Sequence, residues 1–235
     1  MCQRTWMYLE PIFASDDINK TMPTESALFK EVDNLWRTTM EQIEADPGIL
    51  DLIERDNIAN QFQEANRKLD RIQKSLNDYL EEKRLVFARF YFLANEDLLM
   101  LLAQTKDPRA VQPHMDKCFE AIYRVLFSDN DCILAMISAE GESVNFIKPV
   151  DVNEGDKKGN VEKWMLEIET IMRKTLRQQC LLSLADYYKN GRNVWVKGWP
   201  GQIILAVDQI DWTSGVEKAI PVEDGLESYR NECNS

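Results

Sequence analysis

The chain has 235 residues, of which 44% are hydrophobic and 29% are charged, with nine glycines and eight prolines. This length permits one large domain or two modest ones around a real core, and the composition excludes disordered and fibrous proteins. The formal net charge of −12 argues against binding to nucleic acid or to another acidic polymer, including the surface of a microtubule. No apolar run approaches the ~20 residues of a membrane-spanning helix, so no membrane location is expected.

The cysteines and the single histidine point away from metal chemistry. The five cysteines lie far apart and form no Cys-x-x-Cys pair, so we expect reduced, mostly buried thiols in an intracellular protein. His114 precedes Cys118 by four residues but has no second pair of ligands, which argues against a zinc site. Because His114 follows Pro113 at a predicted helix start, a structural or capping role is the simpler interpretation.

Apolar residues at helical spacing predict two long helices in the first part of the chain. One begins after Thr24, which is a fair N-cap, and ends at Asp46-Pro47-Gly48. In the second, over Ile58 to Leu80, the apolar residues are three or four positions apart and form one narrow seam. We expect this seam to pack inside a bundle of the same chain. The alternative is that it binds a helix of another protein.

An aromatic run follows the second helix at Phe87, Phe90, Tyr91 and Phe92. It has too many aromatic residues for one amphipathic face, so at least two surfaces are expected to bury it. These residues are more simply core than binding surface, although a seam at which two subdomains reseat could use them in both ways. Asn95 is then expected to cap a short helix over 96–104, and Pro113 to open another helix through Leu126.

From Cys132 the hydrophobic period drops to two, which predicts a β-hairpin over 132–148. Its turn contains Glu140, Gly141 and Glu142, and Gly141 can adopt the positive φ that such a turn requires. An isolated two-stranded hairpin is only marginally stable, so it must lie on helices or on another protein. We expect the acidic tip to be exposed to solvent in this chain.

The last third of the chain is predicted to be helical again. Residues 150–160 contain two glycines and five charges and read as a flexible junction. A long helix is expected from Val161 to about Asn190, followed by a turn at Trp199 to Gln202 and a helical run over 203–210. The predicted organisation is therefore a first subdomain over 1–149, the junction, and a second helical subdomain over 161–235. We expect both chain ends to be internal positions of a longer protein.

Two glycine groups were candidates for a phosphate-binding loop, and neither fits. Residues 155–160 lack the spacing and the Ser/Thr of such a loop, and residues 198–201 are interrupted by Trp199-Pro200. No Gly-x-Ser-x-Gly elbow occurs, and one histidine with no nucleophile near it in the sequence gives no triad. No catalytic residue and no cofactor-binding or metal-binding residue is therefore assigned to this chain.

Several blocks of sequence recur in the order of a known family. They include residues 69–84, Arg89-Phe90-Tyr91-Phe92-Leu93, Gln104-Thr105-Lys106-Asp107-Pro108 and Trp199-Pro200-Gly201-Gln202. In these blocks the chain resembles the linker region of a dynein heavy chain, on the N-terminal side of the motor, and the Trp-Pro-Gly-Gln form favours the axonemal type. The chain departs from the family at Ala88, where proline is usual.

The resemblance implies a mainly α fold, an elongated array of helical bundles with one inserted β-hairpin facing the motor ring. It implies a mechanical linker that lies across the AAA+ ring and transmits its ATP-driven change as the power stroke of minus-end-directed microtubule motility in cilia and flagella. ATP and Mg would bind in the ring and not in this chain. The implied location is the cytoskeleton of the axoneme.

The implied partners are the AAA+ ring of the same heavy chain and the dynein intermediate, light intermediate and light chains, with the microtubule only an indirect partner. The candidates for interaction or hinge residues are Phe87, Phe90, Tyr91, Phe92, Glu140, Gly141, Glu142, Trp199 and Gln202. Two alternatives stay open: a free-standing helical scaffold that binds through the 58–80 seam, and an enzyme.

Overall fold

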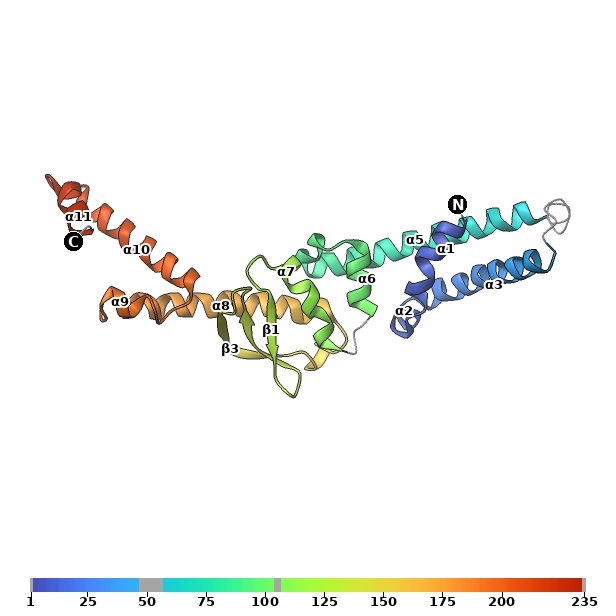
Figure 1. Cartoon of the computed structure of the whole chain (residues 1–235), viewed down its shortest axis with the longest axis horizontal. Helices are drawn as coiled ribbons and strands as arrows, with labels where there is room; N and C mark the ends of the chain where they lie inside the picture. The colour runs from blue at the N-terminus through green and yellow to red at the C-terminus, as the bar shows by residue number, and fades with distance from the viewer. Residues whose placement is uncertain (1, 47–56, 104–106, 234–235) are drawn as a thin grey trace.

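The computed structural model describes residues 2–46, 57–103 and 107–233. It is a mainly α, elongated array with helical bundles towards both ends and a small antiparallel sheet between them (Figure 1). The α-helices are α1 Cys2–Phe13, α2 Asp16–Thr21, α3 Pro23–Ala45, α5 Ile58–Val86, α6 Asn95–Ala103, α7 Met115–Cys118, α8 Val161–Tyr187, α9 Arg192–Trp195, α10 Gly201–Ala219 and α11 Gly225–Cys233. The 3-10 helices are η1 Ala88–Phe92, η2 Pro108–His114 and η3 Gly155–Lys157, and the strands are β1 Arg124–Phe127, β2 Cys132–Ile137 and β3 Ser143–Asp151.

The seam of α5 packs within the chain, as the bundle interpretation predicts. α5 lies against α3 and α1, and five of its seam residues are at most 2% exposed, whereas Ile58 and Phe62 at its start are half-buried. The five buried residues are Ala65, Leu69, Ile72, Leu76 and Leu80. Because neighbouring helices of the same chain cover these five residues, they are not exposed for binding to a helix of a second protein.

The expected helix starts differ from the structure in their details. α3 begins at Pro23, with Met22 and not Thr24 at the N-cap, because proline with its fixed φ suits the first helical position. Asn95 is the first residue of α6, and its side-chain oxygen accepts a hydrogen bond from Arg84 Nη2 at 2.7 Å. The predicted stop at Pro47-Gly48 and the end of α6 at Gln104 lie outside the described residues.

The helix predicted from Pro113 to Leu126 is wrong. α7 ends at Cys118, and Arg124–Phe127 forms strand β1, which pairs with β2. The Gln112 side chain fixes this change, because it donates to the Val125 carbonyl at 2.7 Å and accepts from the Val125 N–H at 3.1 Å. The predicted hairpin is therefore two strands of a three-stranded antiparallel sheet in the order β1-β2-β3.

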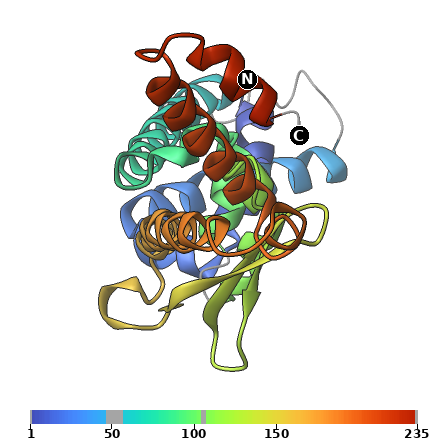
Figure 2. The same cartoon turned by 90° about the vertical axis from the view of Figure 1, so that its left-hand side faces the viewer.

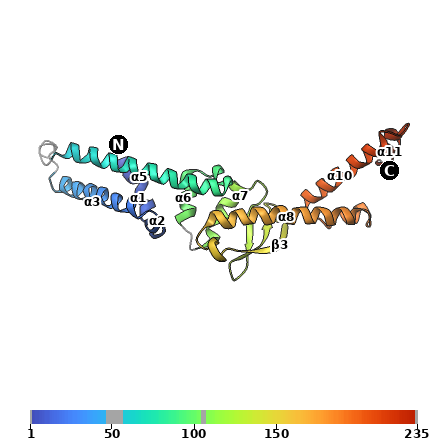
Figure 3. The ribbon, with the colours of Figure 1, turned by 180° about the vertical axis from the view of Figure 1, so that it is seen from behind.

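The N-terminal half of α8 covers the sheet and also contacts α5 (Figure 3). Trp164, Met165 and Ile168 of α8 are buried there, and the Ile147 N–H donates to Thr175 Oγ1 at 3.2 Å. α10 and α11 extend on the opposite side of α8 from the sheet (Figure 2). α8 ends at Tyr187, a few residues before the predicted Asn190.

The core of the described residues forms two hydrophobic clusters. The larger cluster includes the buried residues of α1 to α8 and the sheet, and the smaller one consists of Trp195, Ile203 and Val207. Within the predicted junction 150–160, Val150 and Val152 are buried and Lys157 contacts Glu154 and Glu167 at 2.8 and 2.5 Å. The division at this junction stays a prediction.

The expectation that the thiols are mostly buried is wrong, because only two of the five cysteines are buried. Cys2 and Cys118 are buried, Cys132 and Cys180 are half-buried, and Cys233 is exposed, and all five are free thiols. Among the helices described, none has the length and apolar character to cross a membrane.

Candidate interaction and hinge site

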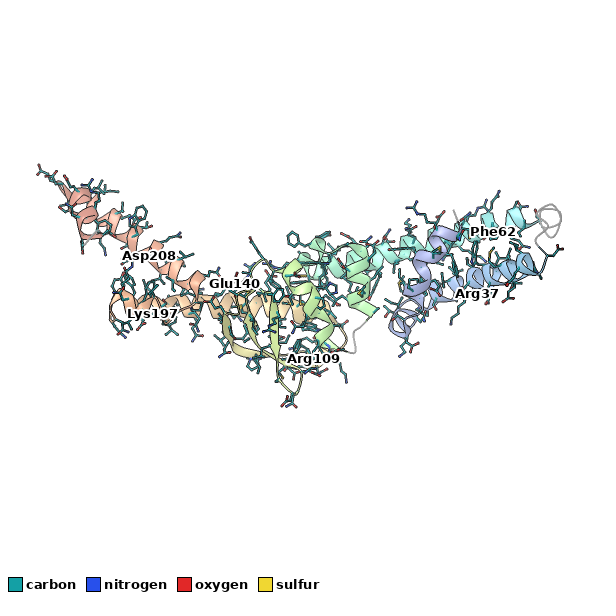
Figure 4. All side chains as sticks on the ribbon, in the orientation of Figure 1. Arg37, Phe62, Arg109, Glu140, Lys197 and Asp208 are labelled. Atoms are coloured by element: carbon teal, nitrogen blue, oxygen red, sulfur yellow. The ribbon has the colours of Figure 1, made fainter. Side chains whose placement is uncertain are left out.

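A cleft of 430 Å³ lies where the β2–β3 loop meets the start of α10. Glu140 and Glu142 reach it from the loop, and Gln202 reaches it from α10, so three of the predicted site residues line one cleft. In Figure 4 the labelled Glu140 lies beside the point where α10 leaves α8. The apolar lining of the cleft comes from the sheet, from α8 and from the segment before β1, and includes Phe119, Ile122, Met136, Val144, Met172 and Leu176.

The β2–β3 loop is held in a tight turn by its own backbone. Gly141 has φ +87°, as predicted, and its N–H donates to the Ser138 carbonyl at 3.1 Å. Ser138 Oγ also accepts from the Glu142 N–H at 3.2 Å. A left-handed residue other than glycine would be strained here, so Gly141 fixes the direction in which Glu142 leaves the loop.

Glu142 reaches from this loop to the N-terminus of α10. The Gly201 N–H donates to Glu142 Oε1 at 3.0 Å, across 59 positions of sequence. The first N–H groups of a helix have no partner within the helix, and the helix dipole favours a negative charge at this end. The expectation of an exposed tip is confirmed, because Glu140, Gly141 and Glu142 are all exposed, and Glu142 also makes this one contact with α10.

Arg89 also lines the cleft, and the sequence analysis named it only within a block of the family resemblance. Its guanidinium lies 4.7 Å from the centre of the Phe119 ring and donates to the Cys118 carbonyl at 3.1 Å. It also contacts Glu169 of α8 at 3.5 Å. Burial alone would raise the pKa of Glu169, but hydrogen bonds from Arg173 and Arg89 lower it below its usual value. The sequence feature that could have identified Arg89 is its position as a single arginine inside the aromatic run.

The structure divides the aromatic run into two pairs. Phe87 and Phe90 are fully buried and pack edge to face with ring centres 4.9 Å apart, whereas Tyr91 and Phe92 are 54% and 69% exposed. The reason is η1, because a 3-10 helix with about three residues per turn places Phe87, Phe90 and Leu93 on one side. The expectation that two surfaces bury the whole run is therefore wrong for Tyr91 and Phe92.

Trp199 does not line the cleft. Its indole N–H donates to Asp186 Oδ2 at 2.9 Å, which ties the turn before α10 to the end of α8. The neighbouring Trp195 is buried and donates to Ser183 Oγ at 2.9 Å. The structure thus brings Glu140, Glu142 and Gln202 together at the cleft, whereas Trp199 contacts the end of α8.

The titratable groups of the described residues offer little for metal or thiol chemistry. No group of three or more His, Cys, Asp or Glu side chains among them is arranged to hold a metal ion. His114 is buried, and burial lowers its pKa. Burial also raises the pKa of Cys118 to about 12, so this thiol is protonated and unreactive at neutral pH.

Comparison with known proteins agrees with the sequence blocks. The family model described as "Dynein heavy chain, N-terminal region 2" matches residues 1–183. The chain belongs to the dynein heavy chain family. It is 47% identical over 233 residues to human dynein axonemal heavy chain 3, which is 99% of this chain and 6% of that protein.

Two further relatives of the same family give similar values. The chain is 41% identical to rat dynein axonemal heavy chain 12, over 98% of this chain and 7% of that protein. It is 40% identical to mouse dynein axonemal heavy chain 1, over 93% of this chain and 5% of that protein. The chain thus spans only a small part of the dynein heavy chains that it matches.

Proposed function

We propose that this dynein heavy chain segment is a mechanical linker of an axonemal dynein, which transmits the ATP-driven change of an AAA+ ring as the power stroke of minus-end-directed motility on microtubules in cilia and flagella. The observation that carries the proposal is the match to axonemal relatives along 99% of the chain. The ring, with its ATP and Mg, belongs to the rest of the heavy chain, so the segment itself does no catalysis.

The arrangement of the helices supports a lever. α5 has 29 residues and α8 has 27, and each crosses from one part of the array to another (Figure 1). A packed helix resists bending, so force applied near α3 is carried through α5 and α8 towards α10. The compliant places are then the short connections and the cleft at the start of α10.

The partners follow from the same proposal. They are the AAA+ ring of the same heavy chain and the intermediate, light intermediate and light chains of the complex, with the microtubule reached only through other parts of the motor. The net charge of −12 supports an indirect role, because a microtubule surface is also acidic.

The test is made in the full-length heavy chain. A Gly-Ser-Gly-Ser insertion after Gln178, an exposed position of α8, softens the lever between its two clusters. We expect microtubule gliding to slow while ATP turnover by the ring persists. The matched control inserts the same residues between Asp129 and Asn130, in the β1–β2 turn, and should leave gliding unchanged. Unchanged gliding with the α8 insertion would refute the lever.

A further inference from the structure

α8 is the continuous element that joins the two hydrophobic clusters. Val161, Trp164, Met165, Ile168 and Ile171 of α8 are buried in the larger cluster, and Leu176 packs against both clusters. A single helix between two packed bodies resists bending less than a helix that its neighbours hold on several sides. The direction of α10 and α11 relative to the sheet therefore depends on any second contact that crosses this joint.

The side-chain hydrogen bonds of α10 divide into two groups. Tyr188 Oη donates to Asp211 Oδ1 at 2.8 Å, and Arg192 donates to Asp208 Oδ1 at 2.7 Å, so both hold α10 to the end of α8 and to α9. Glu142 instead comes from the β2–β3 loop. Of the side-chain hydrogen bonds between described residues, the one from Gly201 N–H to Glu142 is the one that ties α10 directly to this loop of the sheet.

We propose that Glu142 is a positioning residue, a carboxylate brace that fixes the direction of α10 and α11 against the sheet. With this contact the sheet, α8 and α10 form a closed triangle, whereas without it no side-chain hydrogen bond between described residues links α10 to the sheet or its loops. Pro200 at the N-cap position has no side-chain acceptor, so the carboxylate of Glu142 supplies what the helix start lacks. The positive φ of Gly141 and the Ser138 hydrogen bonds keep the carboxylate in reach.

The brace is exposed to solvent, so it is modest in strength and sensitive to salt. Any partner that takes up the Glu142 carboxylate weakens its hold on α10, and by reciprocity the direction of α10 changes the affinity for that partner. Its consequence for a motor stroke rests on the proposed function, whereas the brace itself is a property of this chain.

The test measures the distance from the sheet to α10 in the 235-residue chain. Ketone-bearing amino acids at Lys148 on β3 and Glu217 on α10, both exposed, take nitroxide labels without touching the five cysteines. Double electron–electron resonance then gives the distance distribution. Glu142→Gln keeps an acceptor but removes the charge, and Glu142→Ala removes both. Glu140→Gln is the matched control, since it removes a carboxylate from the same loop and the same cleft.

In Glu142→Gln we expect the ratio of braced to displaced distances to fall about two- to five-fold. Glu142→Ala should lower it further, salt of roughly 0.5 M should shift the wild type in the same direction, and Glu140→Gln should match the wild type. Distributions of both Glu142 variants that superimpose on the wild type would overturn the brace, as would an equal shift in Glu140→Gln. Either result would leave the proposed lever function untouched, because the gliding test does not depend on Glu142.

Discussion

The ion pair between α5 and α8 gives a direct test of how these helices are held together. Lys83 Nζ lies 2.5 Å from Glu162 Oε1, and the two side chains are 18% and 4% exposed. The second oxygen of Glu162 is buried and has no hydrogen-bond partner. Lys83 also lies over the Tyr79 ring, 5.5 Å from its centre. Burial, with Glu162 and Glu82 nearby, raises the pKa of this tyrosine to about 12.

Lys83→Met should be strongly destabilising, because it leaves the Glu162 carboxylate buried without its counter-charge. Breaking a buried pair in this way costs about 3–5 kcal/mol. Glu162 lies in the first turn of α8, where the helix dipole stabilises its negative charge by about 0.3–1 kcal/mol and so offsets part of this cost. The expected loss is therefore about 2–5 kcal/mol. Glu162→Gln should cost less, about 1–2 kcal/mol, because the ammonium that it leaves keeps some solvent and the Tyr79 ring.

The double variant Lys83→Met with Glu162→Leu separates the pair from the packing around it. Well-packed apolar residues often replace a buried ion pair at little cost, so we expect most of the lost stability to return. Urea unfolding followed by tryptophan fluorescence measures these variants and Glu162→Leu alone, since Trp164 is buried two residues from Glu162. Lys68→Met is the matched control. Its pair with Glu31, at 2.7 Å, is more exposed and is expected to contribute less than about 1 kcal/mol.

The reasoning fails if Lys83→Met costs no more than Lys68→Met. It also fails if the double variant loses the sum of the losses measured for Lys83→Met alone and Glu162→Leu alone, because the two side chains would then act independently.

Three further predictions concern other contacts. Gly215→Ala should cost about 1–3 kcal/mol, because its Cβ would lie 2.2 Å from the Tyr229 ring, and amide exchange of α11 should accelerate. Phe90→Ala should cost about 3–5 kcal/mol in urea and Phe92→Ala less than about 1 kcal/mol, because the first ring is buried and the second is exposed. Burial lowers the pKa of His114 in the folded state, so the neutral imidazole contributes its full stability above the unfolded pKa of 6.5 and loses it as the pH falls below that value. In His114→Gln the urea midpoint should therefore change less with pH between about pH 7.5 and 5.5.

Each of these predictions has its own control. Gly201→Ala should be tolerated, since nothing lies within 4 Å of its added Cβ, so equal losses at both glycines would contradict the clash argument. Equal losses from the two phenylalanine variants would contradict the division of the aromatic run. The charged groups around His114 are Asp97, Asp116 and Lys117, and a pH slope that survives in His114→Gln would belong to them.

The local parts of the fold followed from the sequence because local spacing determines them. The seam of α5 repeats over several turns, so one helical face was the only arrangement that buried it, and Gly141 was identified by the φ that its turn needs. β1 was missed because Ile122, Val125 and Leu126 fit a helical spacing as well as a strand. The choice was made by the distant side chain of Gln112 and by pairing with β2, neither of which a local pattern contains.

The candidate site could be predicted only in part for the same reason. Its acidic loop was recognised, but the partner of Glu142 is the start of a helix 59 positions later. That contact depends on where the turn after α9 directs α10. The tryptophan contacts of this turn, from Trp195 to Ser183 and from Trp199 to Asp186, fix its direction, and they appear only once α8 and α9 are packed.

α10 is held firmly to the end of α8 and to α9, and only weakly to the β2–β3 loop of the sheet. In the firm contact, Ile203 and Val207 are buried against Trp195, and the Asp211 and Asp208 contacts support them. In the weak contact, one exposed carboxylate holds the Gly201 end. If the brace opens, we expect the C-terminal part of α8 to move together with α9, α10 and α11, because the contacts among these four helices are the more costly to break. Under the proposed function such a lever moves between discrete directions, since packed clusters reseat as units and do not deform continuously.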